Sequence, residues 1–494
     1  MCCGKRDLLP AGHLGPIVLT KAEYTRWVGT FRKRWGVLIE IPLDFSSSTP
    51  LYRQIADHLR AMIRTGALEE DFRLPGSRRF ALFLGMSRTT INEAYNLLAN
   101  EGLIRLEGRR GTFVQRSGLP ATPLLCRGRR WDLASGTPST DFLPLRQLAS
   151  LWRSVLQEEE NVLLMPPVAG LEALRQALVG HAATRGIPAC WQDVLVTSGV
   201  QEGLALSLEA LRRHGVKRLW TEMLTYPQLP PLAAMGGQEL RLLPAHPADW
   251  EQVMGTMTAQ DAIYLIPSFH NPTGRTLPLA LREDLLRQTH LRGCWIVEDD
   301  AYGELRYGEF SVPALRALPG AERILYLGSF SQLLFPGWRL GYALVPRELH
   351  SAFSYAKMHF SGATATPSQL LVLAFLRQGF LEPALADIRK GMAHRMNTLH
   401  TGLRRMFPQL SLEMPQGGVF LWLETPGWSG REAALRARHL GVWVAPGELF
   451  APDRRPVEAV RLAVSRTSVS DLLDVETLLV RAWKDAPWCA PLHS

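Results

Sequence analysis

The sequence predicts a chain of the α/β class, in which a small N-terminal unit of helices and a β-hairpin precedes a large domain with a mostly parallel sheet. Three observations support this prediction. The length of 494 residues is too great for one ordinary core and favours two to four domains. Apolar residues recur every four positions around residue 55, as on one face of a helix. From residue 131 to residue 483, apolar strand-like runs alternate with amphipathic helical stretches.

Composition divides the chain into four segments. Residues 1–45 show no clear period, and we expect an N-terminal extension there without assigning it a function. Residues 46–116 form the small unit. Residues 117–130, which contain glycine, proline and clustered arginine, are predicted to be a linker. The large domain is predicted over residues 131–485.

The positive charge is concentrated near the N-terminus. The whole chain has a formal net charge of +9, and residues 1–130 hold 21 Lys and Arg against 11 Asp and Glu. The rest of the chain is almost neutral, with a net charge of −1. Such a segment attracts a polyanion through phosphate contacts and counterion release. A solvated basic face would carry the same charge, so this alternative stays open.

Membrane proteins, secreted proteins and metalloproteins are disfavoured. The chain has no uninterrupted apolar stretch of about 18 residues to cross a bilayer, and its first 40 residues lack the apolar core of a secretory signal. We therefore expect a cytoplasmic protein without membrane contact. The six cysteines lack metal-ligand or CxxC spacing, so no metal site is expected.

The small unit has the pattern of a helix-turn-helix. Apolar residues at every fourth position from Leu51 to Ile63 predict a first helix with one buried stripe. A second helix, residues 77–84, ends at Gly85, and the Ser87 hydroxyl can cap a third helix. On the third helix, the residues expected to face inward are Ile91, Ala94, Tyr95 and Leu98. Two helices joined by a glycine turn are typical of this motif.

The start of the third helix presents polar side chains that suit a DNA groove. These outward residues, which can donate to phosphates or read base edges, are Arg88, Thr89, Asn92 and Asn96. After Gly102, residues 103–114 alternate apolar and polar positions around the basic turn at Arg109 and Arg110, which predicts a two-stranded wing. A small helical module with a hairpin used for dimerisation is the alternative.

The segment from "PLYRQIADHLRAMIRTGAL" to "RLPGSRRFALFLGMSRTTINEAYNLLANEGLIRLEGRRGTFV" closely resembles the winged helix-turn-helix of GntR-family regulators. It departs from that family at residues 69–71, Glu-Glu-Asp, where a basic residue and a Pro-Gly turn are usual. We expect this departure to alter the loop rather than the DNA-reading face. The resemblance implies that double-stranded DNA is a partner. The expected DNA contacts are Arg78, Arg88, Thr89, Asn92 and Arg110.

In the large domain, chemically suggestive residues follow the predicted strands. Ser198 and Gly199 come between a strand at residues 194–197 and a helix, where backbone N–H groups can hold a phosphate. The same Ser-Gly pair could be only a helix cap. Asn271, in "PSFHNPTG", lies after the strand 262–266, at the edge where open α/β sheets bind ligands.

Two further strand ends carry ionisable groups. The strand 294–297 leads into "EDDAY", where Asp299 can pair with a protonated pyridine nitrogen and Tyr302 can bond a phenolic oxygen of the same ring. The same residues can also occur in an ordinary loop that binds no ligand. The strand 324–327 opens into "GSFSQLLFPGWRLGY", and the groups there that suit a phosphate monoester are Ser329, Ser331 and Arg339. Arg461, on a predicted strand, can clamp a carboxylate or pair with an acidic neighbour.

In this order and at these spacings, the motifs resemble the fold-type I aminotransferases, and with the N-terminal unit they resemble the MocR subfamily of GntR regulators. The resemblance implies pyridoxal 5'-phosphate as cofactor, with Asp299 on its ring nitrogen and both Tyr302 and Asn271 on its phenolic oxygen. Tyr226 matches the ring-stacking aromatic, although it could equally be a core tyrosine. The implied phosphate ligands are Ser198, Gly199, Ser329, Ser331 and Arg339. A head-to-tail homodimer is also implied.

One position departs sharply from that resemblance. Gln332 stands directly after "SFS", where the family carries the lysine that forms the Schiff base. An amide nitrogen is not nucleophilic, so no internal aldimine can form there and ordinary transamination should be crippled. Lys357, 25 residues on, could replace that lysine only through an unusual loop placement. We expect non-covalent binding of pyridoxal or pyridoxamine phosphate; a decayed pocket is the competing interpretation.

Three hypotheses of function follow. The first is a DNA-binding transcription regulator whose large domain senses a vitamin B6 vitamer or an amino compound and changes how two DNA-reading heads are presented. The second is a working aminotransferase with a DNA-binding appendage, which Gln332 disfavours. The third is a constitutive DNA-binding dimer with a decayed pocket, which the retained polar residues disfavour.

Overall fold

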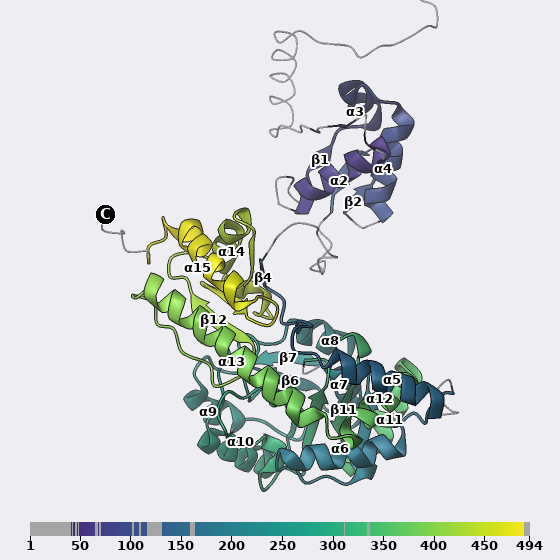
Figure 1. Ribbon diagram of the computed structural model, residues 1–494, viewed down its shortest axis with the longest axis vertical. Helices are drawn as coiled ribbons and strands as arrows, with labels where there is room; N and C mark the ends of the chain where they lie inside the picture. The colour runs from purple at the N-terminus through teal and green to yellow at the C-terminus, as the bar shows by residue number, and fades with distance from the viewer. Residues whose placement is uncertain are drawn as a thin grey trace, which may run out of the picture. The chain divides into compact units, whose positions relative to one another are not determined.

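The chain divides into two units, Met1–Arg127 and Gly128–Ser494, in the computed structural model (Figure 1). The residues that the structure describes are 41, 43–44, 47, 49–64, 68, 71–100, 103–107, 110–115, 131–158, 164–310, 312–332 and 336–488. The predicted linker and most of the predicted extension lie outside them. Among the described residues, no helix combines the length and apolar character needed to span a bilayer.

The described part of the N-terminal unit consists of three helices and a small antiparallel sheet. Its elements are α2 (Leu51–Arg64), β1 (Arg73–Leu74), α3 (Ser77–Leu84), α4 (Arg88–Asn100), β2 (Ile104–Leu106) and β3 (Thr112–Val114). The strands lie in the order β1-β3-β2. Side chains from all three helices form one core, in which Ile55, Leu59, Phe80, Ile91 and Leu98 have no exposed surface.

The helix boundaries predicted for this unit are confirmed. Helix α3 ends at Gly85, whose φ of +66° is a left-handed conformation that glycine adopts at low cost. The Ser87 hydroxyl accepts a hydrogen bond of 3.1 Å from the Thr90 N–H and so caps α4. The four residues predicted to face inward on α4 are all buried. The wing is present as β2 and β3, while Gly108 and Arg109 at its tip lie outside the described residues.

A seven-stranded sheet is the centre of the large unit. Its strands are β5 (Val194–Thr197), β6 (Arg218–Thr221), β7 (Glu239–Leu242), β8 (Asp261–Leu265), β9 (Trp295–Asp299), β10 (Ile324–Ser329) and β11 (Gly341–Leu344). They lie in the order β5-β11-β10-β9-β8-β6-β7. Only β11 runs antiparallel to its neighbours. The carboxyl ends of β5 and β10 therefore meet the start of β11 at one edge of the sheet.

The large unit also contains a four-stranded sheet, in the order β12-β14-β13-β4. Its strands are β4 (Trp131–Leu133), β12 (Phe420–Glu424), β13 (Val442–Pro446) and β14 (Ala459–Ala463). The long helix α13 (Leu381–Met406) runs from the larger sheet toward this smaller one (Figure 1). The other helices are α5 (Leu145–Glu158), α6 (Glu172–Thr184), α7 (Val200–Arg213), α8 (Leu229–Met235), α9 (Trp250–Met254), α10 (Leu279–Arg292), α11 (His350–Phe360), α12 (Thr366–Arg377), α14 (Gly430–His439) and α15 (Val469–Trp483).

Two strands are longer than the sequence suggested. β9 and β10 were expected to end at Val297 and Leu327, where the apolar runs end, but each continues for two more residues. The added residues include Asp299 and Ser329, which are buried. Polar groups therefore lie within the sheet itself, at the edge where its strands end.

Candidate functional site

Five of the predicted residues converge where β5, β10 and β11 meet. We call them the serine–arginine corner: Ser198, Gly199, Ser329, Ser331 and Arg339. Gly341 is paired in register with both Ser329 and Thr197, which brings the two strand ends together. A Cβ atom added to Gly199 would lie 3.2 Å from Nη2 of Arg339, so the guanidinium packs against the backbone at the start of α7. The Ser331 N–H donates to Ser329 Oγ at 3.1 Å.

Two buried oxygens at this edge have no hydrogen-bond partner among the described residues. They are Oγ of Ser331 and Oε1 of Gln332. Gln332 also lines a small enclosed cavity together with Ser139 and Ser465. Because an unpaired buried oxygen costs free energy, both groups are available to a donor that enters the site.

Asp299, the last residue of β9, is a buried carboxylate that receives only neutral donors. Its Oδ2 accepts a 2.7 Å hydrogen bond from the Tyr264 hydroxyl, and its Oδ1 accepts one of 3.2 Å from the Ala301 N–H. Burial raises the pKa of Asp299 to about 6, although these hydrogen bonds oppose the shift. No ion pair of the described residues includes this carboxylate. A cation placed beside it would therefore be stabilised.

Tyr264 was not predicted as a site residue. It lies on β8, in an apolar run, and its ring is fully buried, so from the sequence it reads as an ordinary core residue. The signal that could have found it is a hydroxyl-bearing side chain on the strand that neighbours the Asp299 strand. A buried tyrosine normally finds a hydrogen-bond partner.

The two predicted ring contacts lie near Asp299. Tyr302 is buried, and its ring meets that of Phe420 edge to face with centroids 5.1 Å apart. Tyr226 is half-buried. Burial, with a contribution from the negative charge of Asp299, raises the pKa of Tyr226 to about 12, while Arg339 opposes the shift. Tyr226 therefore lies close enough to Asp299 and to Arg339 of the corner for both charges to affect its pKa.

Two aromatic rings and two hydrogen bonds hold the guanidinium of Arg461 in place. Its guanidinium carbon lies 4.2 Å from the ring centroid of Phe420 and 4.6 Å from that of Phe450. Nη1 donates to Asn271 Oδ1 at 2.7 Å, and Nη2 donates to the Ala134 carbonyl. Burial lowers the pKa of Arg461 to about 10. No ion pair of the described residues contains Arg461, and its two described hydrogen-bond partners are neutral groups.

Lys357 does not lie in a loop. It is part of α11, and its side chain is fully buried. Its Nζ donates to Glu202 Oε1 at 3.2 Å and to Thr364 Oγ1 at 3.1 Å. The amine is thus engaged at the first turn of α7, and the unusual loop placement that would let Lys357 act in place of a lysine at position 332 is absent.

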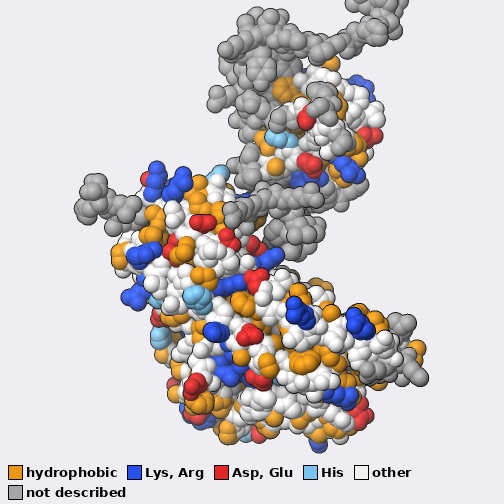
Figure 2. All heavy atoms as spheres, viewed as in Figure 1, with side chains coloured by type: hydrophobic (Ala, Val, Ile, Leu, Met, Phe, Trp, Pro, Cys, Tyr) orange, Lys and Arg blue, Asp and Glu red, His pale blue; other side chains and the backbone are white. Residues whose placement is uncertain are grey.

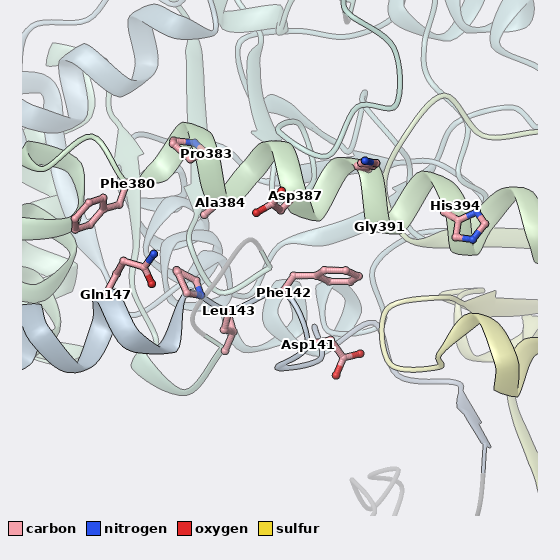
Figure 3. A pocket seen from close by; sticks show the side chains of 12 residues that line it. Asp141, Phe142, Leu143, Gln147, Phe380, Pro383, Ala384, Asp387, Gly391 and His394 are labelled. Carbon is pink, nitrogen blue, oxygen red and sulfur yellow. The ribbon is translucent and has the colours of Figure 1, made fainter.

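A hollow larger than the Gln332 cavity lies apart from these groups. Figure 3 shows it between α13 and the segment that precedes α5. Its volume is about 800 Å³. It shares Phe142 and Leu143 with the small cavity of Gln332 but contains none of the predicted site residues. This hollow therefore does not coincide with the predicted site.

The predicted DNA contacts lie on the surface of the N-terminal unit. Those exposed to solvent are Arg78 on α3, Arg88, Thr89 and Asn92 on α4, and Arg110 in the wing. Lys and Arg side chains also appear on both units in the face shown in Figure 2. Basic surface alone thus does not single out a DNA-binding face, and the prediction for α4 depends on the polar side chains at its start.

The acidic departure at residues 69–71 is partly visible. Asp71 has a φ of +64°, and its Oδ1 accepts a hydrogen bond of 2.6 Å from Nη2 of Arg105 on β2. Glu69 and Glu70 lie outside the described residues. The described part of the departure therefore binds a wing strand rather than α4, as expected for a change in the loop.

Replacing Asp299 with Asn should make the protein less sensitive to pH. The folded pKa of about 6 exceeds the ordinary value of 3.8, so the wild type gains stability from protonation at low pH and loses it as the pH rises through 6. The variant should gain about 1–2 kcal/mol relative to wild type between pH 5 and pH 8. Urea unfolding at both pH values measures this change.

A matched control uses a carboxyl with the opposite shift. Asp261, bonded to Arg218 and Trp220, has its pKa lowered to about 2 overall despite its burial. Asp261→Asn should therefore lose stability at pH 8. If the free energies of unfolding of Asp299→Asn and wild type differ by the same amount at both pH values, burial does not raise the pKa of Asp299.

Comparisons with known proteins cover both units. Residues 131–473 match the family "Aminotransferase class I and II", and residues 51–114 match "Bacterial regulatory proteins, gntR family". The HTH-type transcriptional regulator YisV of Bacillus subtilis is 27% identical over 469 residues, which cover 86% of this chain and 94% of YisV. The probable rhizopine catabolism regulatory protein MocR of Rhizobium meliloti is 29% identical over 395 residues, which cover 74% and 79%.

A solved structure matches the large unit. It is LysN, the α-aminoadipate aminotransferase of Thermus thermophilus, complexed with N-(5'-phosphopyridoxyl)-L-leucine. The TM-score is 0.66 at 28% sequence identity, and the match covers 72% of this chain and 92% of that one. The large unit therefore shares its fold with an aminotransferase over almost all of that enzyme's length.

Proposed function

Because the chain belongs to the MocR-type regulators of the GntR family, we propose that its aminotransferase-like domain senses a phosphorylated vitamin B6 compound and thereby controls DNA binding. The observation that carries the proposal is the buried Asp299 carboxylate beside the serine–arginine corner. A carboxylate and a phosphate-binding corner at one sheet edge suit a ligand with a basic ring nitrogen and a phosphate.

The chain's own groups fit such a ligand. The ring nitrogen, when protonated, would supply the cation that Asp299 lacks, and Tyr302 with Asn271 would bond the phenolic oxygen. The corner offers a helix N-terminus, hydroxyls and a guanidinium to the phosphate, including the unpaired Ser331 Oγ. When bound, a pyridoxal phosphate supplies an electron-accepting ring and an aldehyde that reacts with amines.

Gln332 favours a signal over catalysis. Its amide can donate and accept hydrogen bonds but cannot attack an aldehyde or carry a proton between substrate atoms. The ligand would then be held without a covalent bond, and its occupancy would follow its concentration. A ligand that equilibrates freely in this way is suited to report its own supply.

Arg461 extends the site toward an amino compound with a carboxylate. The guanidinium is held rigidly by Phe420, Phe450 and Asn271, which lowers the entropy lost when a carboxylate binds. Its Nε has no hydrogen-bond partner among the described residues. An amino-acid effector could therefore bind beside the vitamer.

The DNA would be read by α4 and gripped by the wing. We expect two copies of the chain to act together as a head-to-tail homodimer, so that a change in the large domains alters the spacing of two reading heads. Thermodynamic linkage then requires that DNA change the affinity for the vitamer by the same factor.

Fluorescence anisotropy tests the proposal directly. The purified protein is titrated onto labelled DNA from upstream of its own and neighbouring genes, with and without saturating pyridoxal phosphate. We expect selective binding whose Kd shifts with the vitamer in wild type, and selective binding without that shift in Asp299→Ala. Selective binding that ignores the vitamer in both proteins would contradict vitamer sensing and favour the constitutive DNA-binding dimer.

A further inference from the structure

A buried ion pair lies directly under the serine–arginine corner. Lys357 on α11 is fully buried, and the Glu202 side chain, in the first turn of α7, is 13% exposed. Their Nζ and Oε1 atoms are 3.2 Å apart. Neither residue belongs to the set of predicted phosphate ligands, yet the pair joins α11 to the first turn of the helix that follows Ser198 and Gly199.

The Glu202 carboxylate is tied to the corner through the backbone. Its Oε2 accepts a hydrogen bond from the Ser198 N–H, and its Oε1 accepts one from the Ser361 hydroxyl as well as from Lys357. Lys357 also donates to Thr364 Oγ1, which in turn donates to the Val196 carbonyl on β5. Helix α11 is therefore connected at two points to the strand and turn that lead into Gly199.

The pair is electrically balanced. Burial acts to raise the pKa of Glu202, but the charge of Lys357 and the hydrogen bonds lower it overall. Burial also lowers the pKa of Lys357, and Glu202 opposes that shift. Without the lysine, an uncompensated carboxylate would remain a few residues from the site of a phosphate dianion, where screening by water is weak.

We propose that Lys357 is a positioning residue that allows the corner to accept a phosphate monoester dianion, by cancelling the charge of Glu202 and fixing the Ser198 N–H. This inference rests on the proposed function, because it assumes that the corner holds a phosphate. In this proposal Lys357 does not replace the Schiff-base lysine of the family. It acts only on the shape and the charge of the corner.

The charges of the two side chains give predictions of opposite sign. Lys357→Met leaves a carboxylate that repels the dianion, so the Kd for pyridoxal phosphate should rise about tenfold or more. Glu202→Gln leaves a cation that attracts the dianion, so its Kd should fall below that of wild type and below that of the double variant. The double variant carries neither charge and should return to within about threefold of wild type, as expected for coupled neighbours.

Pyridoxal, which lacks the phosphate, is the control ligand for pyridoxal phosphate. Equilibrium dialysis of the full-length protein measures both Kd values for wild type and the three variants, with inorganic phosphate as a competitor. We expect the ratio of the two Kd values to change in Lys357→Met, whereas the Kd for pyridoxal changes by less than about threefold. If Lys357→Met does not fold, Glu202→Gln should still bind pyridoxal phosphate more tightly than the double variant.

The outcomes separate this inference from the proposed function. Equal weakening of both ligands in Lys357→Met, or a loss that persists in the double variant, would overturn the role of Lys357 and leave vitamer sensing intact. Equal affinities of Glu202→Gln and the double variant for pyridoxal phosphate would do the same. No binding of pyridoxal phosphate by wild type would overturn both proposals.

Discussion

Gln332→Lys should convert a protein that pyridoxal phosphate does not label into one that it labels stoichiometrically. The substitution supplies an amine directly after Ser331, at the end of the strand that carries Ser329 and next to the corner. If Asp299 and the corner hold the ring and the phosphate, the aldehyde lies within reach of that amine. The bound vitamer should then absorb visible light and become permanently attached after borohydride reduction.

Mass spectrometry of the reduced protein measures this change. Gln332→Met, which has a side chain of similar length and no amine, is the control and should remain unlabelled. A folded Gln332→Lys protein that gains no adduct would favour the decayed pocket. Labelling of wild type would instead point to another lysine, and peptide mapping would show whether Lys357 is that residue.

Arg88→Ala should weaken operator binding by about 1–3 kcal/mol, or roughly five- to 150-fold. Arg88 is the first residue of α4 and is exposed, so its loss removes a phosphate or base contact without opening the core. Anisotropy titrations at moderate salt measure the change, and the affinity for pyridoxal phosphate should be unaltered.

Arg347→Ala is the matched control for charge. The Arg347 side chain is 83% exposed on the large unit, and its replacement also removes one positive charge. The operator affinity of this variant should stay close to that of wild type. If Arg88→Ala binds as tightly as this control, α4 is not the recognition helix.

The sequence predicted the helices and strands best where a local signal ends them. Gly85 and Ser87 bound the turn before α4, and the apolar run 194–197 coincides with β5. The apolar runs stop short of the ends of β9 and β10 because the last residues of these two strands, Asp299 and Ser329, are polar. A buried polar residue follows the sheet when its partners are supplied by neighbouring strands, as Tyr264 does for Asp299.

The contacts of the site were harder to predict because they join distant parts of the chain. Lys357 and Glu202 are 155 positions apart, and Arg461 and Asn271 are 190 apart. The spacing of apolar residues along the sequence does not indicate contacts between residues so far apart. Motif order indicated candidate residues, but only the fold shows that Arg461 donates to Asn271 and that Lys357 pairs with Glu202 in the first turn of α7.

The antiparallel placement of β11 has a consequence for how the protein is made. Its start at Gly341 pairs with both Ser329 and Thr197, so the corner exists only after a strand inserts between two segments that are more than a hundred residues apart. Such non-local pairing is slow, because closing a long loop costs conformational entropy before any stabilising contact has formed. A nascent chain that has emerged only as far as Ser331 would thus carry every serine of the corner before the corner itself can form.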